Sequence, residues 1–140
     1  MIRRMKERTM KQLLWVCLGS AIGGGARYTL SGWLLTTLGL SFPVGTLGVN
    51  LIGSFLIGGI MYAGVEASAI PQTARITLVA GFLGGFTTYS AFAYETLERL
   101  QGEVWGSAAL YVVLTVFGCL LACLLGWWGA RLALGLISAW

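Results

Sequence analysis

The fold of this chain is decided by the stretch Gly81-Phe82-Leu83-Gly84-Gly85-Phe86-Thr87-Thr88-Tyr89-Ser90-Ala91-Phe92. The stretch lies in an uncharged apolar run from Ile76 to Tyr94, which is long enough to cross a bilayer as a helix rising about 1.5 Å per residue. An unbroken helix is disfavoured in its middle, because each of the adjacent glycines costs about 1 kcal/mol relative to alanine. The hydroxyl groups that follow compete for backbone partners. We therefore predict a membrane-spanning helix that is broken near residues 84–88.

Two explanations of this stretch remain open from the residues alone. A break frees carbonyl and N–H groups, which are costly in lipid unless they bind something or face a cavity. Broken helices in mid-membrane are recurrent ion sites, because helix ends carry partial charge. Alternatively, the small residues serve only to let helices pack closely.

The composition indicates a membrane protein. Of 140 residues, 57% are hydrophobic and 10% are charged, compared with about 25% charged in soluble domains. The three cysteines, Cys17, Cys119 and Cys123, lie in apolar runs and are interpreted as buried small hydrophobic residues. Cys119 and Cys123 share a helix face, but without histidine or carboxylate neighbours they are a poor metal site. Because the chain has no histidine and no nucleophile with a base in reach, we do not expect an enzyme.

Four apolar runs follow a basic tail at residues 1–12, and they cover residues 13–40, 44–65, 76–94 and 104–130. The short connectors leave no room for a soluble domain. We predict an all-α membrane protein in which residues 13–136 form four transmembrane helices, with both ends on one side. The 21 glycines favour close helix approach. Four short helices enclose little by themselves, so we also expect an oligomer.

Basic residues are concentrated on the side of the two termini. This side carries Arg3, Arg4, Lys6, Arg8, Lys11, Arg75 and Arg131. The opposite side carries Arg99, so the positive-inside rule places both termini in the cytoplasm of a multi-pass protein of the cell inner membrane. Because the tail adjoins an apolar span, we interpret it as a topology signal and a contact with anionic lipid, and we expect no nucleic-acid partner.

Several polar groups within the runs need partners. Asn50 and the stripe Tyr111, Thr115 and Cys119, spaced four residues apart, suit either hydrogen bonds between helices or the wall of a pore. Arg27 interrupts the first run, either as a functional charge or as a side chain that reaches the interface. It supplies positive potential to an anion entrance in both cases.

Aromatic and acidic residues follow the broken stretch. Tyr89 and Phe92 lie on one helix face, where aromatic residues usually pack but can also turn their positive ring edges toward an anion. Thr88 and Glu95 lie on adjoining faces. An unpaired carboxylate at Glu95 would repel anions.

These motifs, in this order and in so short a chain, resemble the CrcB/Fluc family of fluoride channels. The resemblance covers nearly the whole chain and rests on Gly81 to Phe92 followed by Glu95, together with two earlier motifs. The earlier motifs are Gly23-Gly24-Gly25-Ala26-Arg27-Tyr28 and Pro43-Val44-Gly45-Thr46-Leu47-Gly48-Val49-Asn50-Leu51-Ile52-Gly53. The resemblance implies a dual-topology antiparallel dimer that lowers cytoplasmic fluoride by passive electrogenic export.

The resemblance also implies site residues. A structural sodium ion at the dimer centre would be held by the backbone carbonyls of Gly84 and Thr87. The implied fluoride pore is lined by Asn50, Tyr89, Phe92, Thr88, Glu95, Tyr111, Thr115 and Cys119, with Arg27 in the vestibule. Tyr89 stands where the family usually has Phe, Ala91 where it has Thr, and Cys119 where it often has Ser. Because the basic tail favours one orientation, the partner is either a second copy or an oppositely oriented paralogue.

Two other functions remain as alternatives. A small proton-coupled multidrug exporter of the dual-topology type needs a carboxylate embedded in the membrane, and Glu95 is the one candidate in the spans. A subunit that only packs against partners would use Asn50 for assembly alone.

Overall fold

The computed structural model describes residues 2–39 and 41–137, and the side chains of residues 9–39 and 41–135. Its elements are α1 (Ile2–Leu38), α2 (Val44–Met61), π-helical η1 (Tyr62–Glu66), α3 (Gln72–Ile76), π-helical η2 (Thr77–Leu83), α4 (Gly84–Phe86), α5 (Tyr89–Gln101) and α6 (Trp105–Ile137). The described residues contain no strand, which confirms the predicted all-α class.

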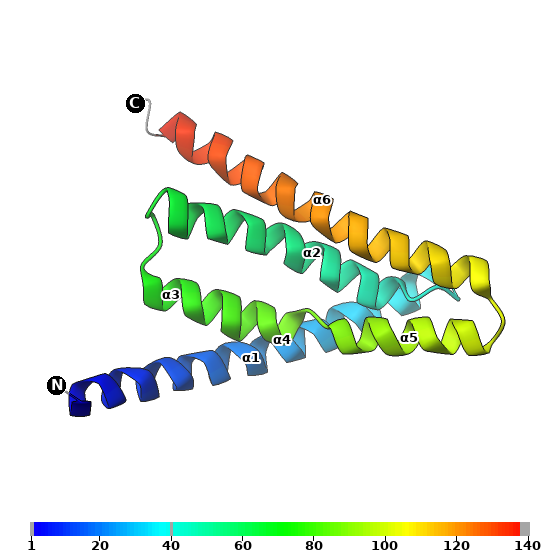
Figure 1. Cartoon of the computed structure of the whole chain (residues 1–140), viewed down its shortest axis with the longest axis horizontal. Helices are drawn as coiled ribbons and strands as arrows, with labels where there is room; N and C mark the ends of the chain where they lie inside the picture. Colours follow the sequence, from blue (N-terminus) through cyan, green and yellow to red (C-terminus); the bar gives the residue numbers. More distant parts are fainter. Residues whose placement is uncertain (1, 40, 138–140) are drawn as a thin grey trace.

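The elements form four long rods (Figure 1). Helix α6 lies along α2, and the third rod runs from α3 through α5 beside α2. Helix α1 crosses the third rod at the level of α4. Both termini lie at the same end of the bundle, as predicted. The backbone of the predicted tail is continuous with α1, whereas the side chains of Arg3, Arg4, Lys6 and Arg8 lie outside the described residues.

Three helical segments are long and apolar enough to cross a membrane: Val44–Glu66, Gln72–Gln101 and Trp105–Gly135. Helix α1 has 37 residues but is not among them, since charged, glycine and hydroxyl residues lower its hydropathy. The segment Gln72–Gln101 extends beyond the apolar run 76–94 at both ends. Its charged last turns remain helical, because Glu, Leu and Arg are good helix formers.

The predicted break in the third rod is confirmed. Helix α4 ends at Phe86, and Thr87 (φ −89°, ψ 160°) and Thr88 (φ −151°, ψ 115°) are extended before α5 begins at Tyr89. The wide π-helical turn of η2 directly before α4 was not predicted. Such turns occur mostly as local distortions of α-helices and are frequent at functional sites.

Glycines bring the rods into backbone contact, as the close-packing explanation predicts. A Cβ atom on Gly58 of α2 would overlap the carbonyl of Cys123 on α6, and one on Gly126 would overlap the carbonyl of Phe55. A Cβ on Gly85 would overlap the backbone of Ser20 on α1. The glycines of the third rod therefore contribute both to packing and to the break.

The buried core is small for a chain of this length, with Val49, Leu83 and Phe86 at its centre. Many large apolar side chains are exposed, among them Phe117 on α6 and Tyr28 on α1. Lipid or another chain must cover this surface, because exposed apolar patches of this extent are rare on soluble monomers.

Replacing Gly58 by alanine tests the contact between α2 and α6. Gly58→Ala places a methyl group against the Cys123 backbone, so we expect a loss of about 1–3 kcal/mol in the free energy of unfolding and a lower Tm in detergent. Gly129→Ala is the matched control, since a Cβ there meets nothing within 4 Å. An equal Tm for the two variants would contradict the close packing.

Candidate functional site

The break in the third rod is bridged by one side chain of α2. Asn50 Oδ1 accepts a hydrogen bond from the Thr88 N–H at 2.8 Å, and Asn50 Nδ2 donates to the Thr88 carbonyl at 3.0 Å. The amide thus satisfies both backbone groups of an extended residue that has no helical partners. Asn50 is 8% exposed and keeps one N–H on Nδ2 for a further acceptor.

The other backbone groups at the break differ in their hydrogen-bond partners. The Thr87 N–H and hydroxyl both donate to the Leu83 carbonyl at 2.9 Å. From α1, Arg27 Nε donates to the Gly85 carbonyl at 3.1 Å. In a continuous helix the Thr88 N–H would donate to the carbonyl of Gly84. Because that N–H is bonded to Asn50, the Gly84 carbonyl loses its helical donor.

The α5 side of the break is a capped helix start. The Thr88 hydroxyl accepts a hydrogen bond from the Ala91 N–H at 3.2 Å and also contacts the Ser90 hydroxyl. A helix N-terminus carries a partial positive charge, and the end of the preceding helix carries a partial negative charge. The break therefore presents sites of both polarities within one turn of chain.

A cleft of about 580 Å³ opens beside the break, between α2, the third rod and α6. It brings together eight of the predicted site residues: Asn50, Gly84, Thr87, Thr88, Tyr89, Phe92, Thr115 and Cys119. None of its lining residues is charged. The cleft is thus a polar but uncharged space within an apolar bundle.

Thr115 contributes the most unusual polar group of this cleft. Its side chain is 8% exposed, and its Oγ1 has no hydrogen-bond partner in the described part of the chain. Buried hydroxyls are nearly always paired, since an unpaired one costs about 1–3 kcal/mol. A hydroxyl that is left free beside a cleft is available to a ligand.

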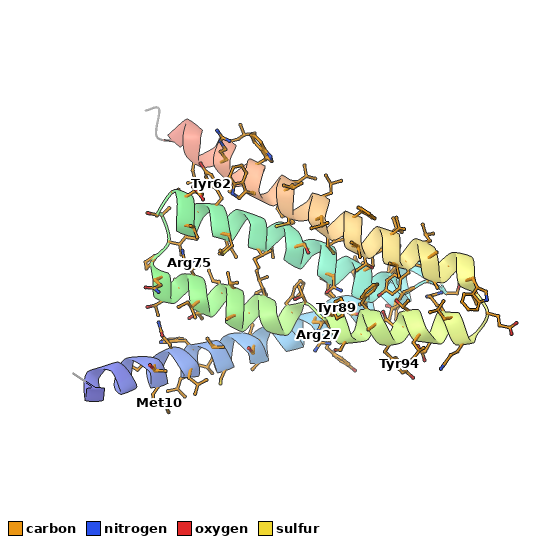
Figure 2. The ribbon with its side chains drawn as sticks, in the orientation of Figure 1. Met10, Arg27, Tyr62, Arg75, Tyr89 and Tyr94 are labelled. Carbon is orange, nitrogen blue, oxygen red and sulfur yellow. The ribbon has the colours of Figure 1, made fainter. Side chains whose placement is uncertain are left out.

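The aromatic rings form a row at the side of the cleft. Phe92 is 7% exposed, and its ring meets the rings of Tyr89 and Tyr111 in edge contacts, with centroids 5.5 and 5.2 Å apart. Tyr89 is 80% exposed. Figure 2 shows Tyr89 and Arg27 at the level of the break.

Two predicted pore residues, Glu95 and Tyr111, and the predicted vestibule residue Arg27 are not among those that line the cleft. Glu95 accepts hydrogen bonds from the hydroxyls of Thr46 at 2.6 Å and Tyr111 at 2.5 Å, so its carboxylate is paired. Tyr111 is fully buried and in ring contact with Phe92. Glu95 also lines a smaller cleft of about 340 Å³ together with Arg99.

Arg27 lies on yet another cleft, of about 440 Å³, that includes Thr46 and Val49. Thr88 lines both this cleft and the larger one. The structure therefore places Arg27 beside the break, although not within the larger cleft.

Sequence reasoning missed two polar residues of the larger cleft, Ser54 and Cys123. Each lies one helical turn beyond a predicted residue, Asn50 and Cys119 respectively, so extending the two stripes by four positions would have found them. The interpretation of the cysteines as buried was wrong. Cys17 is exposed and the other two are half-buried, because the bundle leaves much of its apolar surface uncovered.

Comparison with known proteins places the chain in a family. Residues 14–127 match the family model described as CrcB-like protein, Camphor Resistance (CrcB). The chain belongs to the CrcB family. The matched residues contain the break, the cleft and the paired Glu95, and they exclude the basic tail at residues 1–12.

Curated relatives carry a functional name. The chain is 52% identical over 113 residues to "Fluoride-specific ion channel FluC" of Anaeromyxobacter sp. (strain K). The alignment covers 81% of this chain and 90% of the relative. Proteins of the same name from Citrifermentans bemidjiense and Sorangium cellulosum are 45% and 42% identical to this chain, each over 122 residues. Each alignment covers 87% of this chain, and the two cover 98% and 96% of the respective relatives. Together with the three apolar segments, this family membership makes the chain a multi-pass membrane protein.

Asn50→Leu tests the bridge across the break. The variant leaves the N–H and carbonyl of Thr88 unpaired, each of which costs about 1–3 kcal/mol, so we expect a clearly lower Tm in detergent. Ser54→Ala is the control, because Ser54 lines the same cleft one turn away and has no part in the bridge. A Tm for Asn50→Leu equal to that of the control would contradict this role.

Proposed function

We infer that this chain is a fluoride-specific ion channel that lowers cytoplasmic fluoride by passive electrogenic export across the cell inner membrane. The observation that carries the inference is membership of the CrcB family, with relatives up to 52% identical named as fluoride-specific ion channels. The buried Thr115 hydroxyl beside an uncharged cleft, without a partner among the described residues, supports the same function. A channel is a transport protein, so no catalytic residues are proposed.

The chemistry of the cleft suits a small, strongly hydrated anion. Such an ion must exchange its water for donors at close range. Thr115 offers an O–H, Asn50 offers its remaining N–H, and Phe92 offers a ring edge of positive character. Cys119 adds a weak S–H donor. Because none of these donors carries a full charge, the ion is not trapped.

Beyond Phe92, the path we propose passes Tyr111 and Glu95. The Tyr111 and Thr46 hydroxyls each donate their one O–H to Glu95, so they offer no donor to fluoride but reduce the repulsion that a free carboxylate would exert on it. Arg27, at the break, would add positive potential in the vestibule. Tyr111, Glu95 and Arg27 belong to the fluoride site expected from the sequence, whereas Thr46 does not.

We propose that the working unit is an antiparallel dimer, formed either by two copies or with a paralogue. The cleft opens to the surface and Tyr89 is largely exposed, so a lone chain in a bilayer would turn polar lining toward lipid. A second subunit would cover it. In this arrangement α1 acts as the fourth membrane span, packed against the third rod.

We further propose a structural sodium ion at the break, bound by the Gly84 and Thr87 carbonyls. The residues fit this role, since the Gly84 carbonyl has lost its helical donor and Thr87 has left the helix. Carbonyl oxygens are the ligands that hard cations prefer. One chain offers few such oxygens, so the remaining ligands would come from the partner subunit.

The multidrug-exporter alternative has no support from the cleft. Its lining includes no carboxylate, and both oxygens of Glu95 accept hydrogen bonds from hydroxyls. The relatives are named as fluoride channels.

Fluoride efflux from liposomes that contain only the purified chain tests the function. We expect fast efflux at a fluoride electrode and negligible chloride efflux in the matched control. Thr115→Val keeps the side-chain shape but removes the free donor. A hydrogen bond to a charged group contributes about 1.5–3 kcal/mol, so efflux should fall by roughly tenfold or more.

Comparable chloride flux would overturn the channel assignment. Flux that requires co-expression of an oppositely oriented paralogue would show that the dimer is mixed. Thr115→Ser, which retains the hydroxyl, should conduct better than Thr115→Val if the donor matters.

Sodium binding is tested without any flux measurement. Above the dissociation constant, each tenfold increase in sodium should stabilise the folded protein by about 1.4 kcal/mol per site, seen as a rising Tm. Potassium chloride at the same ionic strength is the control. The same Tm in both salts would contradict the sodium site.

A further inference from the structure

Two free thiols lie one helical turn apart on α6 and line the same cleft. Cys119 and Cys123 are both half-buried, and neither forms a disulfide. They lie on the same helix face as Tyr111 and Thr115. The buried hydroxyl of Thr115 has no hydrogen-bond partner among the described residues. The cleft wall thus carries two sulfur ligands and, one turn before them, a free oxygen.

The ligand set selects a class of metal ion. Thiolates prefer soft cations, whereas carboxylates and carbonyls suit hard ones. Zinc in structural sites takes four ligands, but no group of three or more His, Cys, Asp or Glu able to hold a metal occurs among the described residues. Two sulfur ligands without a third are sufficient for soft ions that accept two-fold coordination, such as mercury(II).

We propose that Cys119 and Cys123 form a two-thiol site for a soft, two-coordinate metal cation on the cleft wall. Binding replaces two S–H bonds by two sulfur–metal bonds and releases two protons to water, with no change in oxidation state. The site lies beside Asn50 and Phe92 in the cleft that we assign to fluoride, so a bound ion obstructs the path. The proposed metal binding does not depend on the chain being a fluoride channel. Only the proposed block of transport rests on that function.

The binding experiment uses Cys17→Ser as the parent protein. Cys17 is exposed on α1, outside the cleft, so its removal leaves only the two cleft thiols. Mercury(II) is titrated into the purified protein, and thiolate–metal absorption in the ultraviolet reports binding. We expect one ion per chain and a loss of affinity of about 100-fold or more when Cys119→Ser or Cys123→Ser removes one of the two linked ligands.

Two binding results would overturn the proposal. One is two ions per chain, each on a single thiol. The other is a mercury(II) affinity of Cys119→Ser or of Cys123→Ser that equals the affinity of the Cys17→Ser parent.

The transport experiment measures fluoride efflux with and without mercury(II), each variant being normalised to its own metal-free rate. We expect block in the Cys17→Ser parent, reversal by excess dithiothreitol, and loss of sensitivity in Cys119→Ser and in Cys123→Ser. Persistent block in both variants would show that one cleft thiol or another site is sufficient, and it would overturn the proposed two-thiol obstruction. A parent that shows no fluoride efflux, either alone or with an oppositely oriented paralogue, would refute the channel function, and the titration would still decide the metal site.

Discussion

The structure depends on the pair of hydrogen bonds between Asn50 and Thr88. An extended residue within a membrane span leaves an N–H and a carbonyl that lipid cannot satisfy. One primary amide can donate and accept at once, so a single side chain from the neighbouring helix satisfies both groups. The break is therefore tolerable only where α2 brings Asn50 against it, and the close contact of α2 with α6 fixes that position.

The bridge also organises the polar groups around it. Because the Thr88 N–H donates to Asn50, the carbonyl of Gly84, an exposed residue, loses its helical donor. Arg27 from α1 donates to the carbonyl of Gly85. On the other side, α5 starts with its N-terminus at the cleft. One interruption thus yields an oxygen site suited to a cation and a donor-lined space suited to an anion, close together but chemically distinct.

The polar stripe on α6 contains residues that hold helices together and, within a few turns, residues that line the cleft. Tyr111 is buried and bonded to Glu95, so that end of the stripe holds helices together. One turn further, the Thr115 hydroxyl has no partner in the described part of the chain, and the two cysteines beyond it line the cleft. The same helix face therefore packs against other helices at one end and lines the cleft at the other. In our proposal the two thiols give the cleft end an affinity for soft metals that hydroxyls alone would lack.

Local hydropathy was sufficient to predict the all-helical class and the approximate apolar runs. The helix-breaking cost of adjacent glycines was sufficient to predict the break near Gly84 to Thr88. The sequence also placed Asn50 and the α6 stripe among the polar groups that needed partners. The partner of each group depends on how the helices pack: Asn50 bonds to Thr88, Glu95 to Thr46 and Tyr111, and Thr115 to no other described residue. The helical extension to Gln101, the π-helical turn before the break and the cleft positions of Ser54 and Cys123 were likewise not foreseen. These features arise from the packing of separate helices, and spacing along one chain does not encode which neighbouring helix each face will meet.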